Sequence, residues 1–490
     1  MEKEYIVTIK NSVDWQQLHN DIISQYGTDS IPARSVDIVK LRPSNPFNTH
    51  YALTDDEAAK LRTDVRVLAV EEKPPRDYWK LRSTASALQA GFSRHTIRNR
   101  TLLSNYNYNL NGSNVDIVIS DSGINVNHTE FANRISLVSW QGGGTHNTDS
   151  DTFSQHGSHV ASTTAGNTHG WAKGANIIPL KVNIGLANSS VITDGLDVED
   201  SMDAIYEWHK NKNTPTVVNM SWGGGFREVG DASIIDAALA TNLIQIVHRG
   251  TTYTPTTVAN AKSLYGLDVI PYNGKYYIPA RIDSVDTDLE WLTNYTYNPS
   301  IGNNNPCSIH VAVAAGNENY HVSSPTDIGW DNRIIDTTTG YALYYQRGTS
   351  PGWQNSTSLP GETVFFNVGS INWDSGSDVS STFSNKGPGI DIWAVGQAVR
   401  GANGANNTGF KNLSGTSMAS PQVAGVMACY LEVYPQLTPS QLKNKIINDC
   451  SQNYMEDSGV TSYTTTTSIQ GSPNRILYNR YNYANALTIS

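Results

Sequence analysis

The segment Leu413–Pro421 reads Leu-Ser-Gly-Thr-Ser-Met-Ala-Ser-Pro and predicts a tight turn followed by a buried helix. Gly415 permits a turn that a β-carbon would obstruct, and proline is well tolerated only in the first turn of a helix. The apolar residues that follow stand at helical spacing: Val423, Val426, Met427 and Tyr430. This spacing predicts a helix of roughly Met418 to Tyr430, with Ser417 at an N-terminus whose free N–H groups favour negative charge. Taken alone, a serine in this position is most simply an N-cap.

Three further segments carry polar side chains at the ends of expected buried elements. Val115–Gly123 is an apolar run that closes with Asp121, and Ile309–Asn317 is a second apolar run that ends in an asparagine. Both patterns are typical of buried parallel strands, whose carboxyl ends gather functional groups in α/β sheets. Between them, His156 opens a stretch of small residues that predicts a helix start. With the serine of the first segment, these side chains supply a nucleophile, a base, a carboxylate and an amide donor.

Six motifs resemble those of the subtilisin-like serine proteases, or subtilases, and stand in that family's order between about residues 110 and 430. They are Asp121-Ser122-Gly123, His156-Gly157-Ser158-His159-Val160-Ala161, Asn219-Met220-Ser221-Trp222-Gly223-Gly224, Ala314-Ala315-Gly316-Asn317, Ser381-Thr382-Phe383-Ser384-Asn385 and Gly415-Thr416-Ser417-Met418-Ala419-Ser420-Pro421. The loop after the histidine is most similar to the proteinase K branch. The resemblance implies an α/β fold, with a mostly parallel sheet and helices on both of its faces.

The resemblance also implies a serine endopeptidase that cleaves polypeptides through an acyl-enzyme. In this chemistry His156 accepts the proton of the Ser417 hydroxyl and returns it to the leaving amine, while Asp121 orients the imidazole. Asn317 and the backbone N–H of the nucleophile donate hydrogen bonds to the oxyanion. His159 is expected to be a structural neighbour of the base. No cofactor is required for this reaction.

Substrate binding is expected along one strand edge. In the family, the segment that corresponds to Ser221, Trp222 and Gly223 pairs with the backbone of the peptide substrate, an instance of β-augmentation. Ala315 and Gly316 are expected to line the specificity pocket. Trp222 is larger than the aliphatic residue usual at its position. Its side chain either narrows an outer subsite or packs under the sheet.

The N-terminal residues predict a separate small domain. Residues 1–75 have the order strand, helix, strand, strand, helix, strand, which is typical of a ferredoxin-like (βαββαβ) α+β fold. This region resembles the subtilase propeptide of the inhibitor I9 type, which assists folding and inhibits the active site with its C-terminal tail. Residues 76–100 would be a linker with the processing site, at Tyr78 or Leu81, and residues 101–490 the catalytic domain. The alternative is a permanently attached docking domain.

Two further features depart from the commonest family pattern. The chain has more residues after the substrate segment than most members of the family. The excess falls at about 226–282, which predicts an insertion near the rim of the cleft. It is either a lid, an exosite or a docking surface, or a neutral surface elaboration. Asp391 stands where the proteinase K branch has a calcium ligand, and carbonyls from Thr363 to Phe365 would complete such a site. A structural Ca²⁺ ion is one interpretation, and a capping or surface aspartate is the other.

The composition of the chain limits the kinds of partner that the protein can have. A net charge of −10 over 490 residues argues against a nucleic-acid partner, and no run approaches the roughly 18 apolar residues of a membrane span. The first residues lack the basic and apolar regions of a signal peptide, which favours an intracellular or virion-associated location over secretion. One competing hypothesis for the function follows from these features. It is a catalytically silent structural or docking protein on a subtilase fold, for example in a virion.

Overall fold

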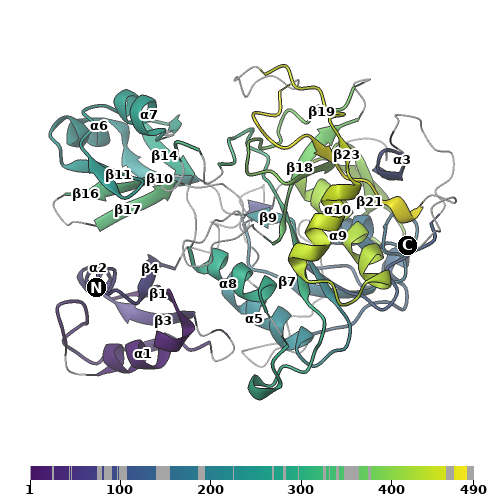
Figure 1. Ribbon diagram of the computed structural model, residues 1–490, viewed down its shortest axis with the longest axis horizontal. Coiled ribbons are helices and arrows are strands. Elements are labelled where there is room, and N and C mark those ends of the chain that lie inside the picture. The colour runs from purple at the N-terminus through teal and green to yellow at the C-terminus, as the bar shows by residue number, and fades with distance from the viewer. Residues whose placement is uncertain are drawn as a thin grey trace.

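The computed structural model describes the chain apart from a set of short segments. The residues outside the description are 1, 25–26, 43–44, 46, 74–79, 82–90, 97, 99–107, 139–154, 186–191, 193, 224–225, 268–269, 280–282, 296, 324–326, 330–331, 338–340, 347–363, 374–376, 460–467 and 483–490. In Figure 1 the N-terminal domain (purple) is a small separate body, and the largest body carries the C-terminal helices in yellow-green.

A mostly parallel sheet forms the centre of the largest body, as the sequence predicts. Its strands lie in the order β23, β24, β20, β18, β15, β8, β6, β7, and every neighbouring pair is parallel except β23 with β24. A short strand, β19 (Val379–Ser380), adds antiparallel to β18. In chain order the main strands are β6 (Asp116–Asp121), β7 (Asn176–Lys181), β8 (Thr216–Met220), β15 (Ile309–Ala314), β18 (Phe366–Asn372), β20 (Ile392–Val395), β23 (Ser451–Gln452) and β24 (Arg475–Ile476).

Helices cover both faces of this sheet, so its strands are buried on both sides. In β6, Ile117 and Ile119 belong to one hydrophobic core and Val118 to the other. Because successive strand residues point to opposite faces, burial of both faces produces a continuous apolar run rather than an alternating one. The first core holds α4 (His156–Ala165), α9 (Thr416–Val433) and α10 (Pro439–Asp449), and the second holds α5 (Val198–His209) and α8 (Asp283–Thr293).

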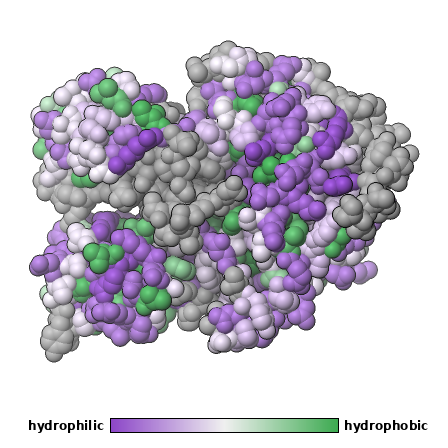
Figure 2. All heavy atoms as spheres, in the orientation of Figure 1, coloured by the Kyte–Doolittle hydropathy of each residue, from purple (hydrophilic) through white to green (hydrophobic). Residues whose placement is uncertain are grey.

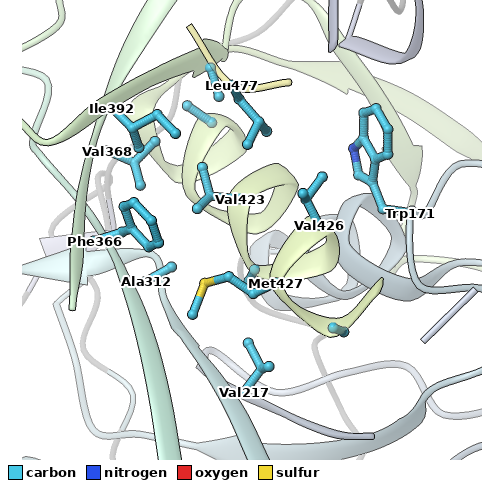
Figure 3. Close-up of a cluster of buried hydrophobic side chains, with 14 of the residues drawn as sticks. Trp171, Val217, Ala312, Phe366, Val368, Ile392, Val423, Val426, Met427 and Leu477 are labelled. Atoms are coloured by element: carbon cyan, nitrogen blue, oxygen red, sulfur yellow. The ribbon is translucent and has the colours of Figure 1, made fainter. Parts of the chain in front are cut away.

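Helix α9 runs through the first core, where Val423 and Met427 lie toward side chains of the sheet and Val426 toward Trp171 (Figure 3). The apolar stripe predicted for this helix is buried. The helix begins two residues earlier than the sequence predicts, so Pro421 lies in its second turn and not in its first. Proline at this point removes one backbone hydrogen bond of the helix, the one that would end on the carbonyl of Ser417.

The N-terminal domain has the predicted ferredoxin-like order and its own hydrophobic core. Its sheet has the strand order β2, β3, β1, β4, and all neighbours are antiparallel. A capping box at Thr54 and Glu57 starts the second helix, where it satisfies exposed backbone N–H groups. The elements are β1 (Lys3–Ile9), α1 (Trp15–Ile23), β2 (Ile38–Lys40), β3 (Asn48–Leu53), α2 (Asp55–Leu61) and β4 (Val67–Glu72).

Charged side chains of the N-terminal domain are buried against α5 and α8. The guanidinium of Arg42 is fully buried, and it donates to both carboxylate oxygens of Asp203 at 2.9 Å and to Asp288 at 2.8 Å. The Nζ of Lys73 donates to Asp197, the residue before α5, at 2.8 Å. These contacts join the N-terminal domain to the two helices that cover the second core.

The region of the expected insertion folds into a unit with a small core of its own, at the upper left of Figure 1. Its strands form two groups, β10-β14-β13 and β12-β11-β16-β17. Strands β16 (Asn332–Asp336) and β17 (Tyr341–Gln346) come from beyond residue 282, and Ile246 pairs with Ile334 across β11 and β16. The other elements are β10 (Phe226–Asp231), α6 (Ala232–Ala240), β11 (Ile244–His248), β12 (Thr251–Tyr253), α7 (Val258–Tyr265), β13 (Ile270–Tyr272) and β14 (Lys275–Pro279).

The face shown in Figure 2 is mixed in character, with hydrophobic residues scattered among hydrophilic ones. Within the described segments, no helix combines the length and the apolar character that a membrane crossing needs.

Candidate active site

Asp121 and His156 form a hydrogen-bonded pair between two elements of the large domain. Asp121 is the last residue of β6 and His156 the first of α4, and both side chains are buried. The Nδ1 of His156 lies 2.8 Å from Oδ1 of Asp121. A carboxylate can only accept, so Nδ1 carries the proton of the neutral imidazole. The same carboxylate oxygen accepts the backbone N–H of Ser122 at 2.7 Å, which fixes the orientation of the carboxylate.

Ser417 is the second residue of α9, which packs against α4. Its hydroxyl donates to the carbonyl oxygen of Ser221 at 3.0 Å, and the Ser221 hydroxyl donates to the carbonyl of Ser417 at 2.9 Å. The second bond replaces the helix hydrogen bond that Pro421 cannot make, because proline has no N–H. The predicted nucleophile is therefore held by a reciprocal contact with the predicted substrate segment.

Two polar residues behind this contact were not singled out from the sequence. The Asn219 side-chain amide donates to the Ser221 hydroxyl at 2.9 Å, and the Ser420 hydroxyl donates to Oδ1 of Asn219 at 2.8 Å. Both side chains are fully buried. Their only signal in the sequence is that each lies inside one of the family motifs, which does not reveal that the two motifs meet.

Asn317 follows β15, and contacts with Thr416 orient its side-chain amide. Its Oδ1 accepts the backbone N–H of Thr416 at 2.8 Å and the Thr416 hydroxyl at 3.0 Å. Because these bonds occupy the oxygen, the amide nitrogen is the end that remains for another acceptor. That Nδ2 atom is buried and finds no hydrogen-bond partner in the part of the chain that the structure describes. Thr416, the residue before Ser417, thus fixes the side-chain amide of Asn317 as a donor beside the start of α9.

The loop after β15 is held from a second side by Asn385. Its amide donates to the carbonyl of Ala315 at 2.8 Å, and its backbone N–H donates to the carbonyl of Gly316 at 2.9 Å. The N–H of Gly316 donates to the Thr416 hydroxyl at 3.0 Å. Gly316 has φ 107°, a region open to glycine and strained for other residues. Both predicted pocket residues are buried at the end of β15.

The predicted substrate segment is a strand edge with a partner. Strand β9 (Trp222–Gly223) pairs antiparallel with β5 (Lys80–Leu81), with Leu81 opposite Trp222 and Lys80 opposite Gly223. The side chain of Trp222 is fully buried, and its indole N–H donates to the carbonyl of Ser120 at 2.8 Å. Of the two interpretations of Trp222, the structure favours packing under the sheet, because the indole is hydrogen-bonded to the end of β6 and belongs to the second hydrophobic core.

The sequence profile of the subtilase family (peptidase S8) matches residues 112–472, which is most of the chain. The chain belongs to the subtilase family. It is a subtilisin-like serine peptidase, a hydrolase whose substrates are polypeptides.

Relatives of this subtilase include two proteins with broad alignments. The extracellular serine proteinase of Thermus sp. (strain Rt41A) is 27% identical over 431 residues, which cover 86% of this chain and 73% of that protein. Alkaline protease 1 of Aspergillus flavus is 26% identical over 491 residues, covering 97% and 91%. The crystal structure of fervidolysin from Fervidobacterium pennivorans, a keratinolytic enzyme related to subtilisin, matches with a TM-score of 0.51 at 14% identity. It covers 97% of this chain and 60% of that one, and it supports the fold.

These relatives correct one expectation from the sequence. The preference for an intracellular or virion-associated location over secretion is contradicted, since relatives of this subtilase include a proteinase named as extracellular. The preference depended on the composition of the first residues, which is a weak argument about location.

His159 behaves as the structural neighbour that the sequence predicts. It is fully buried on α4, and its Nε2 lies 3.0 Å from the carbonyl of Val399, in β21 (Val399–Ala402). A carbonyl only accepts, so Nε2 carries the proton. Burial lowers the pKa of His159 to about 3, so the ring stays neutral at physiological pH.

Asp391, for which the sequence left open a calcium ligand or a capping or surface aspartate, is paired with a lysine. The Nζ of Lys443 lies 2.7 Å from Oδ1 of Asp391 and donates to the carbonyl of Phe365 at 2.9 Å. Thr363 lies outside the described residues. Among the described residues, no group of three or more His, Cys, Asp and Glu side chains could hold a metal ion. An ammonium between these two oxygens does not fit a Ca²⁺ ion at the same point, because both cations would need the same space.

Proposed function

We propose that this subtilase is a serine endopeptidase with Asp121, His156 and Ser417 as its catalytic triad. The observation that carries the proposal is the 2.8 Å hydrogen bond between Asp121 and Nδ1 of His156. With the proton on Nδ1, Nε2 is the basic nitrogen, which takes the proton of the Ser417 hydroxyl during attack and gives it to the leaving amine. Asp121 stabilises the imidazolium that forms in between.

The tetrahedral oxyanion would be bound by the Asn317 amide and the backbone N–H of Ser417. The support is the orientation of Asn317, whose oxygen is held by Thr416 while its amide nitrogen stays available. Donors of this kind stabilise charge that develops only in the transition state, and loss of one typically lowers kcat by about 10²–10³. We assign Ala315 and Gly316 to the pocket for the side chain before the scissile bond. The short chain segment between α4 and β7 supports membership of the proteinase K branch.

The test is labelling by a fluorophosphonate probe together with peptide hydrolysis. Ser417→Ala should abolish both, because no nucleophile remains. Ser440→Ala is the matched control, since Ser440 is likewise the second residue of a helix, α10. It should leave labelling and hydrolysis unchanged. Labelling that persists in Ser417→Ala would refute the assignment. Nothing in the structure favours the catalytically silent alternative.

We further propose that residues 1–75 act as an intramolecular inhibitor and that the chain is made as a precursor. The support is the antiparallel pairing of β5 with β9, because β9 is the edge that would pair with a substrate peptide. A segment that already pairs with this edge excludes other peptides from it. The buried ion pairs of Arg42 with α5 and α8 hold the N-terminal domain in place.

The register of β5 indicates where the precursor is cut. Lys80 is opposite Gly223 and Leu81 opposite Trp222, so the chain leaves β5 in the direction of Ser221. The carbonyl of Ser221 lies 3.0 Å from the Ser417 hydroxyl oxygen. We therefore place the scissile bond directly after Leu81 or one residue later. Tyr78, the other candidate from the sequence, precedes β5 and lies outside the described residues.

Intact mass and N-terminal sequencing of the purified protein test this assignment. The active chain should begin at residue 82 or 83, and Ser417→Ala, purified in parallel, should remain uncut. A cut at residue 82 or 83 in Ser417→Ala would show that another protease makes it. We also propose that the enzyme acts outside the cell, supported by the name of the Thermus relative. Activity confined to the medium of the producing cells would agree with this proposal.

A further inference from the structure

Lys443 reaches from α10 into a polar site at the edge of the central sheet. Its side chain is buried, with 7% of its surface exposed. The ammonium lies 2.7 Å from Oδ1 of Asp391 and 2.9 Å from the carbonyl oxygen of Phe365. It also lies 5.7 Å from the centre of the Phe366 ring, within the range of a cation–π contact. One cation therefore joins three segments of the chain.

The two acceptors come from the starts of neighbouring strands. Phe365 precedes β18, and Asp391 precedes β20, which pairs parallel with β18. The second carboxylate oxygen of Asp391 accepts the backbone N–H of Asn367 at 2.9 Å, and the Asp391 N–H donates to the Asn367 carbonyl at 3.0 Å. Each oxygen of the carboxylate thus has a partner, the lysine on one and the backbone on the other.

A carboxylate and a backbone carbonyl that converge on one point are typical ligands of Ca²⁺, which takes 6–8 oxygens at about 2.3–2.6 Å. An ammonium offers three donors to such oxygens at hydrogen-bond distances and brings its positive charge on a covalent stem. We propose that the Lys443 ammonium is the permanent cation of this site, so that the chain holds Asp391 and the Phe365 carbonyl together without a metal ion.

The position of Lys443 matters for the strands that carry the active site. Strand β18 pairs parallel with β15, and the carbonyl of Val368 accepts the N–H of Ala315, two residues before Asn317. A cation that fixes the start of β18 therefore supports the strand that carries the predicted oxyanion donor. With a lysine as that cation, removal of calcium should leave this region intact.

Thermal unfolding of the full chain tests the proposal, with Ser417→Ala as the background that prevents self-digestion. The melting temperature is measured with 10 mM Ca²⁺ and with EDTA, for the background chain and for its Asp391→Asn variant. The shift caused by Ca²⁺ should be the same in both chains, since Asp391 is not a calcium ligand. A Ca²⁺ shift that is larger by several degrees in the background chain than in Asp391→Asn would overturn the proposal.

A second pair of variants tests the lysine. Lys443→Met keeps most of the side-chain volume but removes the charge, and should lower the melting temperature in EDTA by roughly 5 °C, because a largely buried carboxylate loses its partner. The control is Lys445→Met, on the same helix, where the ammonium lies 4.5 Å from the centre of the Tyr434 ring. Equal melting temperatures for the two variants would overturn the proposal. If Lys443→Met does not fold, Lys443→Gln replaces it, with the same expected difference from the control.

Discussion

Pro421 and Ser221 together determine how the backbone of Ser417 is held. Proline has no N–H, so the Ser417 carbonyl lacks the partner that a helix normally supplies four residues later. The Ser221 hydroxyl donates to this carbonyl at 2.9 Å instead. In the other direction the Ser417 hydroxyl donates to the Ser221 carbonyl at 3.0 Å. The proposed nucleophile and the substrate strand therefore keep a fixed relative position.

Ser221→Ala should destabilise the protein and slow catalysis. The variant leaves the buried Ser417 carbonyl without a donor, which typically costs about 1–3 kcal/mol in the free energy of unfolding. Denaturant unfolding measures that cost, and kcat for peptide hydrolysis should fall because one of the two hydrogen bonds that position Ser417 is lost. The matched rescue is Ser221→Ala with Pro421→Ala, in which the new N–H of residue 421 can donate to the carbonyl. Failure of the double variant to regain stability would contradict this account of the carbonyl.

The family motifs predicted the residues of the proposed site but not the contacts that hold them. Asp121 and Asn317 could be predicted because each ends an apolar run, a pattern that a single sequence displays. The contact of Ser221 with Ser417 could not, because it joins segments 196 positions apart and depends on the turn in which α9 begins. The position of the Trp222 side chain was equally open, since spacing does not show which face of an edge strand is covered.

At the scale of elements, one loop side chain of the N-terminal domain contacts both α5 and α8. Arg42 follows β2 and donates to Asp203 on α5 and Asp288 on α8. Asn45 and Asn48 also donate to Asp288, so three side chains of the N-terminal domain meet at this carboxylate. The sequence predicted the domain itself from its order of strands and helices. It could not predict this contact, because the partners are 161 and 246 positions away.

Arg42→Met should release the N-terminal domain sooner after cleavage. Removal of one partner from a buried ion pair typically costs about 3–5 kcal/mol, because the remaining carboxylates stay buried without their cation. The measurement is the lag before peptide hydrolysis reaches its full rate, which should shorten. Arg34→Met is the control, since Arg34 pairs with Glu57 inside the N-terminal domain. Equal lags in the two variants would show that Arg42 does not hold the domain.

At the scale of the whole molecule, the doubly covered parallel sheet could be predicted, and the extent of the insertion could not. Continuous apolar strands next to amphipathic helices indicate that sheet, because both faces must be buried. The unit that begins after β9 is completed by β16 and β17, which return to it after β15. Its central pairing, β11 with β16, joins residues about 90 positions apart. Pairing over such a distance leaves no local signal in the sequence.

The attachment of the N-terminal domain to the rest of the molecule should depend on pH. The pKa of Asp288 is raised to about 7: burial raises it most, the nearby Asp203 and Glu199 carboxylates add to the rise, and the Arg42 guanidinium offsets part of it. When the domain leaves, the carboxyl group meets water and its pKa returns toward the ordinary value of about 3.9. Docking is therefore accompanied by proton uptake. The stabilisation that this proton uptake adds to docking is complete below the pKa of the free carboxyl group, about 3.9. It is lost as the pH rises through the pKa of the docked group, about 7.

Release of the N-terminal domain after cleavage should thus be several-fold faster at pH 8 than at pH 6. Cleaved protein is incubated at each pH, and all samples are then assayed at one common pH, which separates the effect of pH on release from its effect on catalysis. Asp288→Asn is the informative variant, because its amide does not titrate and release should become nearly independent of pH. If Asp288→Asn keeps the pH dependence of the parent chain, the titrating group is another one. Faster release at pH 6 in the parent chain would reverse the sign of the coupling and contradict the raised pKa of Asp288.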